Sequence, residues 1–277
     1  MLDCNETDWK LISGVVEGAF GLVFEGPRRV ILLSRLEGRI KSLKLLTVSD
    51  YYLYLRTHPD RLAEFQRLAA IVTNNETYFF RQKYQFELLV KYLFPRHNES
   101  SVDRSIRILS AACSSGEEAY SIGITLTDAG VVHLGYCWEI DGCDVSPIRI
   151  EKANAATYDE YSLRDCDEPT RQRYFLQEKG RFRLRDPYRR GVRFFEANLA
   201  SSATTQSWNR YNAIFCRNAL IYFSERAFHE AISLFYNLLL PDGYLFLGHS
   251  ESLIGRRSDF VPVCLDGTMV YRKVDNP

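Results

Sequence analysis

The chain has 277 residues with 35 basic and 35 acidic side chains, so its formal net charge is +0 and gives no overall field that would select nucleic acid or a membrane surface. Seven cysteines, an odd number with no C-x-x-C pair, argue against a disulfide framework and a zinc site. No apolar run reaches the roughly 20 residues of a membrane span. We expect a cytoplasmic, monomeric protein without a metal that neither inserts into a membrane nor binds nucleic acid.

The first third of the chain has the apolar spacing of helices. Between Trp9 and about residue 93, apolar residues recur at intervals of three and four, as at Leu32, Leu36 and Ile40. We therefore predict a small all-helical domain over residues 1–93. One of its helices, over about residues 28–45, holds a single acid, Glu37, among many basic residues. These are Arg28, Arg29, Arg35, Arg39, Lys41 and Lys44.

Strands and helices alternate over residues 94–277, which predicts an α/β domain with a mostly parallel, doubly wound sheet. The predicted strands are 106–111, 138–145, 213–216 and 244–248, and the clearest helices are 118–127 and 226–240. One segment breaks the alternation. Residues 179–195 alternate polar and apolar side chains on both sides of Asp186-Pro187, which predicts a β-hairpin and hence a small antiparallel insert.

The segment 106–122 joins an apolar strand to a helix through a loop of small residues, Ser110 to Gly116. Such a loop lets a ligand approach the backbone at a helix N-terminus. Glu117 and Glu118 follow the loop directly, and their charges disfavour a polyphosphate. They favour a ligand with positive charge, such as the ammonium and sulfonium groups of S-adenosylmethionine.

A nucleotide site of this kind uses an acid at the end of the next strand to bind the ribose hydroxyls. Asp144 lies at that position. Asp141 competes with it but falls near the middle of the strand. The alternative role for Asp144 is to cap the following helix.

Other polar residues follow the predicted strands or join the two halves. Cys216, Arg217 and Asn218 come at the end of a strand, where open α/β sheets bind ligands. His249 and Glu251 follow the last strand and either line the site or satisfy loop hydrogen bonds. The segment 75–81, with two adjacent phenylalanines beside Arg81, is by itself better explained by core packing with a surface charge.

Four motifs together resemble the CheR-type chemotaxis receptor methyltransferases over about residues 11–273. They are NETYFFR (75–81), SAACSSGEEAYSI (110–122), IFCRNALIYF (214–223) and LLLPDGYLFLGHSESL (238–253). The resemblance implies transfer of a methyl group from S-adenosylmethionine to glutamate side chains of chemoreceptors, with S-adenosylhomocysteine as the product. Ala119 stands where the family usually has proline, and Cys113 where it usually has a smaller residue.

The resemblance also implies the roles of individual residues. Arg81 would pair with the methionine carboxylate, Glu117 with the ammonium group and Asp144 with the ribose. Tyr222 would lie close to the transferable methyl group, and with Arg81 it would shape the reacting centre. The full set of implied cofactor contacts is Asn75, Thr77, Arg81, Glu117, Asp144, Asn198, Leu199, Cys216, Arg217 and Asn218.

Two basic segments have implied partners. In the family, the helix matching residues 28–45 is proposed to meet the acidic methylation region of the receptor, so Arg28, Arg29, Arg35 and Arg39 are candidate docking residues. The alternative is a solvated helix face. In some members, the insert matching residues 179–195 binds a tethering peptide at the receptor C-terminus. The short Asp-Pro-Tyr turn here does not favour such tethering.

A glutamate acceptor is already ionised at neutral pH, because its ordinary pKa is about 4.3. Its methylation therefore needs alignment rather than a general base. Two other functions compete with this one. The chain could methylate a small molecule, which would not need the basic helix, or it could be a non-catalytic adaptor that senses S-adenosylmethionine and binds receptors.

Overall fold

The computed structural model describes residues 4–94, 104–201, 208–257 and 259–274. Its N-terminal part is helical, as predicted. The helices are α1 (Glu6–Phe20), α2 (Pro27–Ser42), α3 (Val48–Thr57) and α4 (Arg61–Val72). Asn5 caps α1 and a Thr47–Asp50 capping box starts α3. The apolar faces of the four helices share one core, which includes Ile12, Leu32, Leu36 and Tyr51.

The helical domain ends with α4 rather than at residue 93. An extended linker follows, and then α5 (Tyr84–Leu88) continues into the π-helical turn η1 (Leu89–Leu93). Phe86 and Leu89 from this pair pack with Ile108 of the sheet. Residues 84–93 therefore belong to the α/β domain. Helical spacing alone could not show this, because it reports a buried face and not the element that buries it.

The main sheet has seven strands in the order β6-β2-β1-β7-β8-β10-β9. The five strands from β6 to β8 are parallel, and β10 and β9 add an antiparallel edge. This confirms the predicted fold class. The strands are β1 (Ser105–Ala111), β2 (Cys137–Asp144), β6 (Val192–Glu196), β7 (Tyr211–Cys216), β8 (Leu239–Leu247), β9 (Phe260–Leu265) and β10 (Thr268–Lys273).

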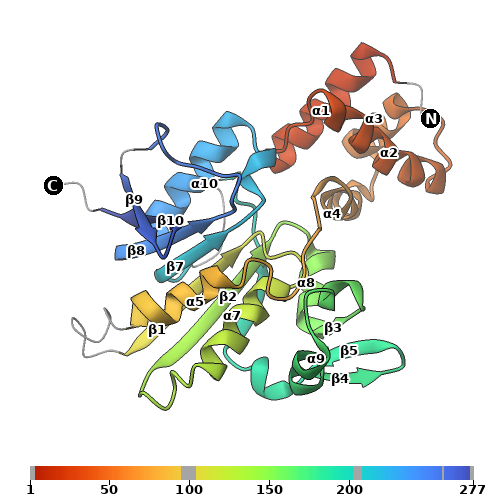
Figure 1. The fold of residues 1–277 in the computed structure, drawn as a ribbon. Helices are drawn as coiled ribbons and strands as arrows, with labels where there is room; N and C mark the ends of the chain where they lie inside the picture. The colour runs from red at the N-terminus through yellow and green to blue at the C-terminus, as the bar shows by residue number, and fades with distance from the viewer. Residues whose placement is uncertain (1–3, 95–103, 202–207, 258, 275–277) are drawn as a thin grey trace.

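Helices cover both faces of this sheet (Figure 1). On one face, α10 (Glu225–Leu238) packs Phe228 and Phe235 against Leu109 and Ile214. On the other, α5 and α7 (Glu117–Asp128) pack against alternate residues of the same strands, such as Ile108. A further helix, α8 (Pro147–Ala155), follows β2 and contacts β6. This two-sided cover explains why the central strands read as nearly continuous apolar runs.

The hairpin predicted over residues 179–195 is wrong in its pairing. The small antiparallel sheet consists of β3 (Thr157–Tyr158), β5 (Arg181–Leu184) and β4 (Phe175–Glu178), in that order, with its tight turn at Lys179 and Gly180. Asp186–Tyr188 is a 3₁₀ turn, η3, after which β6 joins the main sheet parallel to β2. Polar–apolar alternation predicts a half-buried strand but does not identify its neighbour. The insert is completed by η2 (Tyr161–Leu163) and α9 (Glu168–Tyr174).

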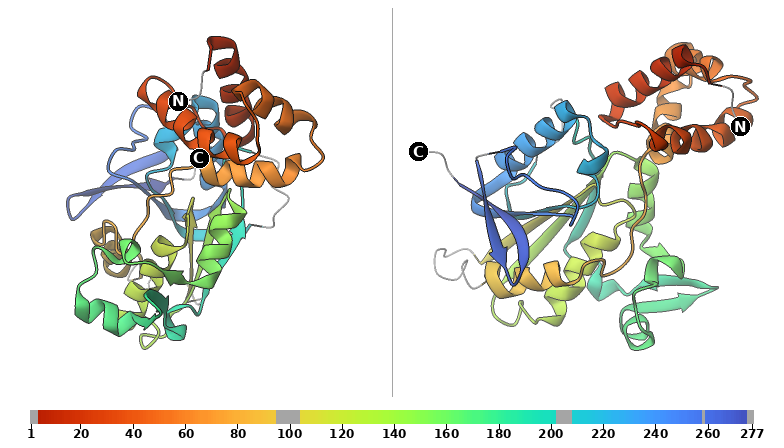
Figure 2. Two further views of the ribbon diagram at one scale, coloured as in Figure 1. Left: turned by 90° about the vertical axis from the view of Figure 1, so that its right-hand side faces the viewer. Right: turned by 45° about the horizontal axis from the view of Figure 1, so that its top comes forward.

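The helical domain stands beyond the carboxyl ends of the central strands, to one side of the sheet (Figures 1 and 2). Gly21 fixes its junction with the α/β domain. Its φ is +70°, and a Cβ there would lie 2.5 Å from the methyl groups of both Ala200 and Ala227. Leu22 forms an isolated antiparallel bridge with Phe223, so the backbones of the two domains are joined directly. Among the described residues, no helix combines the length and apolarity needed to cross a membrane.

Candidate functional site

A pocket of about 920 Å³, including its open mouth, lies at the carboxyl ends of β1, β2 and β7. The linker after α4 and the junction between the two domains also border it. This is the edge at which parallel sheets bind ligands. The predicted site residues that line it are Thr77, Arg81, Asp144, Asn198, Leu199, Arg217, Asn218 and Tyr222. Asn75, Glu117 and Cys216 do not line it.

The loop after β1 is held against the end of β2. The Cys113 N–H donates to the carbonyl of Cys143 at 2.9 Å, and the Ser114 N–H donates to Asp144 Oδ2 at 2.9 Å. Gly116 closes the loop with a φ of +91°, and a Cβ there would lie 2.9 Å from the ring of Phe194. Glycine is therefore required at position 116 both by the backbone conformation and by the close approach of Phe194 on β6.

Asp144 is buried at the end of β2 and faces the pocket. Burial raises the pKa of its carboxyl group, while backbone N–H groups of Ser146 and Ser114 oppose that shift. The competitor, Asp141, lies in a separate network. Its carboxylate accepts hydrogen bonds from Arg193, Asn209 and Tyr211 and does not line the pocket.

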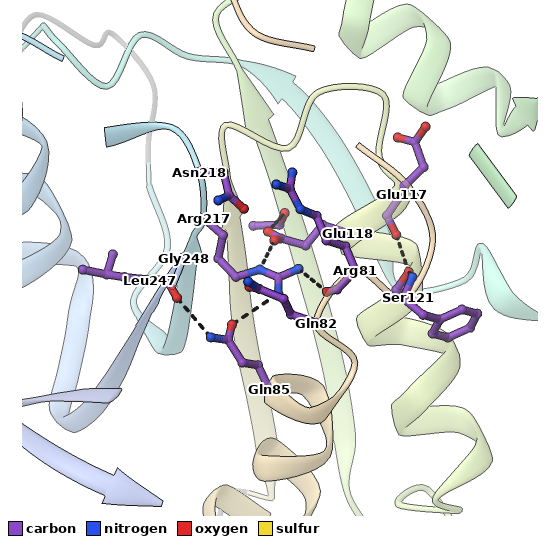
Figure 3. A network of polar contacts seen from close by, with 12 residues as sticks. Arg81, Gln82, Gln85, Glu117, Glu118, Ser121, Arg217, Asn218, Leu247 and Gly248 are labelled. Atoms are coloured by element: carbon purple, nitrogen blue, oxygen red, sulfur yellow. Dashed lines mark hydrogen bonds and ion pairs between the residues drawn. The ribbon is translucent and has the colours of Figure 1, made fainter. Parts of the chain in front are cut away.

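Glu118, and not Glu117, lines the pocket. Figure 3 shows the Glu117 carboxylate turned away from Arg217. It accepts hydrogen bonds from the Ser115 and Ser162 hydroxyls, and burial raises its pKa. Neighbouring helical residues point about 100° apart, which agrees with Glu118 lining the pocket while Glu117 contacts Ser115 and Ser162. Glu118, rather than the predicted Glu117, is therefore the acid that the structure places in the pocket lining.

Arg217 joins the elements around the pocket floor (Figure 3). Its side chain is 2 % exposed, and its Nε lies 2.6 Å from Glu118 Oε2. Its Nη2 donates to the carbonyl of Arg81 at 2.8 Å, and its Nη1 donates to the side-chain oxygens of Gln82 and Gln85 at 3.2 Å. Arg217 thereby ties β7 to α7 and to the linker. Arg217 lines the pocket, and its charge is engaged by protein groups.

The linker presents some of its predicted residues to the pocket and turns one away. Arg81 lines the pocket, and its Nη1 donates to the carbonyl of Glu76 at 3.0 Å. Asn75 instead donates to the carbonyls of Ala70 and Thr73, where it closes the end of α4. Sequence spacing could not separate these roles because the linker has no regular secondary structure.

The turn after β7 is shaped by a partly buried carboxylate, Glu251. Four backbone N–H groups, of Asn218, Leu220, Ile221 and Gly248, donate to it. This decides between the two roles left open for Glu251 in favour of loop hydrogen bonding. His249 Nδ1 lies 3.0 Å from Gln82 Nε2, outside the pocket. Cys216 is fully buried in the core that α10 covers.

The far wall of the pocket forms at the junction of the two domains. The Asn198 side chain donates to the carbonyl of Ala19 at 2.8 Å, and both Asn198 and its neighbour Leu199 line the pocket. The Val23 N–H donates to the carbonyl of Tyr222 at 2.9 Å. Asn74, which sequence reasoning missed, donates to the Tyr222 hydroxyl at 2.7 Å and also lines the pocket. Its signal was slight, since it stands one residue before the NETYFFR motif.

The four candidate docking arginines of α2 all have partners within the chain. Arg28 donates to the carbonyl of Ile221, and Arg29 pairs with Glu6. Arg35 donates to the last carbonyls of α4, those of Ile71, Val72 and Thr73. Arg39 donates to both oxygens of Glu64, at 2.9 and 2.5 Å. Arg35 and Arg39 thus hold the helical domain together.

Glu64 is fully buried, and the Tyr51 hydroxyl also donates to it at 2.8 Å. Burial alone would raise the pKa of Glu64, but hydrogen bonds from Arg39 and Tyr51 and the charges of Arg39 and Arg67 outweigh it and hold that pKa below its usual value. The pair therefore stabilises the fold above the unfolded-state pKa of about 4.3, and the contribution is lost as pH falls through the lower folded-state pKa.

Arg39→Met should lower the free energy of unfolding by about 3–5 kcal/mol at neutral pH, because it leaves a buried carboxylate unpaired. Urea unfolding at neutral and at acidic pH would measure this. The difference in the free energy of unfolding between Arg39→Met and wild type should become smaller in acid, where Glu64 is protonated in both proteins. Lys41→Met is the control, since its pair with Glu37 is exposed and should contribute only about 0.5 kcal/mol. A destabilisation that is equal at both pH values would contradict the charged pair.

The pocket fits a polar, adenosine-containing ligand. Ser114 Oγ and Asn218 Oδ1 are buried there without a hydrogen-bond partner in the part of the chain that the structure describes. Buried polar atoms of this kind are normally satisfied by a ligand or water. Arg81 and Glu118 add a cation and an anion to the lining, and Asp144 adds a carboxylate at the strand end where nucleotide ribose binds.

Comparison with known proteins agrees with this geometry. The pattern described as "CheR methyltransferase, SAM binding domain" matches residues 75–267, and "CheR methyltransferase, all-alpha domain" matches residues 7–70. The chain belongs to the CheR methyltransferase family. It is therefore an enzyme that uses S-adenosylmethionine, and the two matched regions divide close to the end of α4.

Three relatives show how far the likeness extends. The chain is 36 % identical to chemotaxis protein methyltransferase 2 of Vibrio cholerae, over 84 % of this chain and 81 % of that protein. It is 33 % identical to the chemotaxis protein methyltransferase of Escherichia coli, over 98 % and 92 %. It is 34 % identical to the probable biofilm formation methyltransferase WspC of Pseudomonas aeruginosa, over 85 % of this chain but only 54 % of that protein, so it spans about half of that relative.

Proposed function

We propose that this CheR family member transfers a methyl group from S-adenosylmethionine to glutamate side chains of chemoreceptors and so forms methyl esters. The observation that carries the proposal is that all three carboxylates in the pocket lining are already engaged. Glu76 pairs with Arg164, Glu118 with Arg217, and Asp144 accepts two backbone hydrogen bonds. A site arranged in this way suits an acceptor that needs no base.

A glutamate side chain meets that requirement, because its ordinary pKa of about 4.3 leaves it ionised at neutral pH. The bound cofactor supplies an electrophilic methyl group on a sulfonium. Arg81 would hold the methionine carboxylate with its planar fork of donors, Glu118 would face the ammonium group and Asp144 the ribose. The Tyr222 ring would lie beside the methyl group and keep water away from it. The residues then accelerate transfer by aligning and desolvating the reactants.

The test is to incubate the protein with methyl-labelled S-adenosylmethionine and cytoplasmic fragments of chemoreceptors. Label that attaches to a fragment and is released as methanol by mild base identifies a carboxyl methyl ester. Label on a small molecule alone, or binding of both cofactor and receptor without transfer, would overturn the proposal and support one of the two competing functions.

We also infer that the helical domain meets an acidic surface of the receptor through the N-terminal end of α2. Arg28 and Arg29 lie at that end and are partly exposed, and Arg28 packs over the ring of Tyr222, 4.9 Å from its centre. A docked acidic helix would therefore lie close to the pocket. Arg35 and Arg39 are better explained by their contacts with α4.

Arg29→Glu should slow receptor methylation while the affinity for S-adenosylhomocysteine stays at the wild-type value. The wild-type rate should fall as salt screens the attraction. Arg107→Glu is a matched charge reversal on β1, outside the pocket lining, and should leave the rate nearly unchanged. Equal effects of the two substitutions, or a rate that is indifferent to salt, would leave Arg29 without a docking role.

A further inference from the structure

The partly exposed Tyr222 side chain and its backbone are held by contacts at the domain junction, and the residue lines the pocket. Its ring lies under the Arg28 guanidinium, and that guanidinium also donates to the carbonyl of Ile221 at 2.9 Å. The Tyr222 backbone carbonyl accepts a hydrogen bond from the Val23 N–H, and the next residue, Phe223, forms the antiparallel bridge with Leu22. The ring therefore has little freedom to move, and the direction of its hydroxyl group decides what it can do.

The Tyr222 hydroxyl group contacts Asn74, an exposed residue. Its amide nitrogen lies 2.7 Å from the Tyr222 hydroxyl oxygen, and both residues line the pocket. A tyrosine hydroxyl has one proton to donate and two lone pairs that accept. When the Asn74 amide donates to one lone pair of the Tyr222 oxygen, the hydroxyl proton does not point to Asn74. It remains free to hydrogen-bond a group in the pocket.

We propose that Asn74 is a positioning residue for methyl transfer: by donating to the Tyr222 oxygen, it leaves the tyrosine proton to hydrogen-bond the acceptor carboxylate. The inference rests on the proposed function, because it needs an anionic acceptor beside Tyr222. A proton donated to one carboxylate oxygen holds the other oxygen in line with the methyl group. The gain is in alignment of the acceptor and not in cofactor binding.

The test is a double-mutant cycle with a receptor fragment as substrate. Asn74→Ala should lower kcat/KM for the fragment about tenfold, the effect of losing one hydrogen bond of about 1.4 kcal/mol. The affinity for S-adenosylhomocysteine should stay within about twofold of wild type. In a Tyr222→Phe background, Asn74→Ala should have almost no further effect, because the proton that it orients is gone.

Asn74→Asp sharpens the cycle, because a carboxylate can only accept and would draw the tyrosine proton away from the pocket. The Asn74→Asp enzyme should methylate the fragment more slowly than Asn74→Ala when Tyr222 is present. Asn74→Asp in the Tyr222→Phe background measures the part of this effect that is due to the added charge alone. A second readout is independent of turnover. Calorimetric binding of the fragment to enzyme loaded with S-adenosylhomocysteine should weaken in Asn74→Ala.

Equal losses from Asn74→Ala with and without the Tyr222 hydroxyl, or a parallel loss of cofactor affinity, would overturn the inference and assign Asn74 to the shape of the pocket. These outcomes require a wild-type enzyme that methylates the fragment. A wild-type enzyme that binds cofactor but leaves every receptor fragment unmodified would instead overturn the proposed function and, with it, the role of Asn74.

Discussion

Asp144→Ala is expected to weaken binding of S-adenosylhomocysteine about tenfold to a hundredfold. Hydrogen bonds to a charged acceptor contribute about 1.5–3 kcal/mol each, and the substitution removes the carboxylate that faces the pocket at the end of β2. It also frees the Ser114 N–H, which Asp144 Oδ2 now fixes at 2.9 Å. The loop after β1 should therefore loosen as well. Isothermal titration calorimetry measures the change in affinity.

Asp141→Asn is the matched control on the same strand. Asp141 is also buried, but it serves Arg193, Asn209 and Tyr211 and does not line the pocket. Its substitution should lower the thermal midpoint and leave the dissociation constant close to wild type. An unchanged dissociation constant in Asp144→Ala would restrict Asp144 to fixing the loop and the turn before α8.

Arg217→Met is expected to destabilise the protein by about 3–5 kcal/mol, because it leaves the largely buried Glu118 carboxylate, whose side chain is 13 % exposed, without its cation. It also removes the bonds that hold the linker carbonyl of Arg81 and the side chain of Gln85. Cofactor affinity should fall with stability, since Arg81 and Glu118 both line the pocket. Urea unfolding measures the first effect and calorimetry the second.

Two further variants separate the buried charge from a general loss of packing. Adding Glu118→Gln to Arg217→Met should recover part of the stability, because the unpaired charge is then gone. Arg107→Met breaks an exposed pair with Glu139 and should change the free energy of unfolding by no more than about 1 kcal/mol. An Arg217→Met protein with the wild-type free energy of unfolding would show that the contacts of Arg217 are not needed for the fold.

The positions of the loop after β1 and of Asp144 could be predicted because they depend on local sequence. A strand, a loop of small residues and a helix determine where the loop lies, and the next strand determines where its terminal acid lies. Asp144 and the loop 110–116 follow this rule. The choice between Glu117 and Glu118 does not, because it depends on the rotation of α7 about its axis against the sheet.

The basic face of α2 illustrates a second limit. Charged residues at helical spacing usually indicate a solvated face, and nothing near Arg39 in sequence identifies its partner. The partner is Glu64, a buried acid on a helix 25 residues further along the chain. Contacts between helices of this kind are set by packing and have no signature in either segment alone.

Strand pairing is the third limit, although the sequence carries a clear signal for one hairpin. Asp266-Gly267, with φ values of +45° and +79°, forms the turn between β9 and β10. Asp-Gly between apolar runs is a strong sign of a hairpin, so this edge of the sheet could have been predicted. The segment 179–195 carries no such pair, and its alternation does not identify the strands with which it pairs.

The most direct test of the central claim is to map the methyl group on the receptor. Receptor fragments incubated with the enzyme and S-adenosylmethionine would be digested and sequenced by mass spectrometry before and after mild base. We predict a methyl group on the side-chain carboxyl of specific glutamates, lost in base and absent when those glutamates are replaced by alanine. A base-stable methyl group on lysine or arginine, or none on any receptor fragment under conditions in which the cofactor binds, would contradict the account.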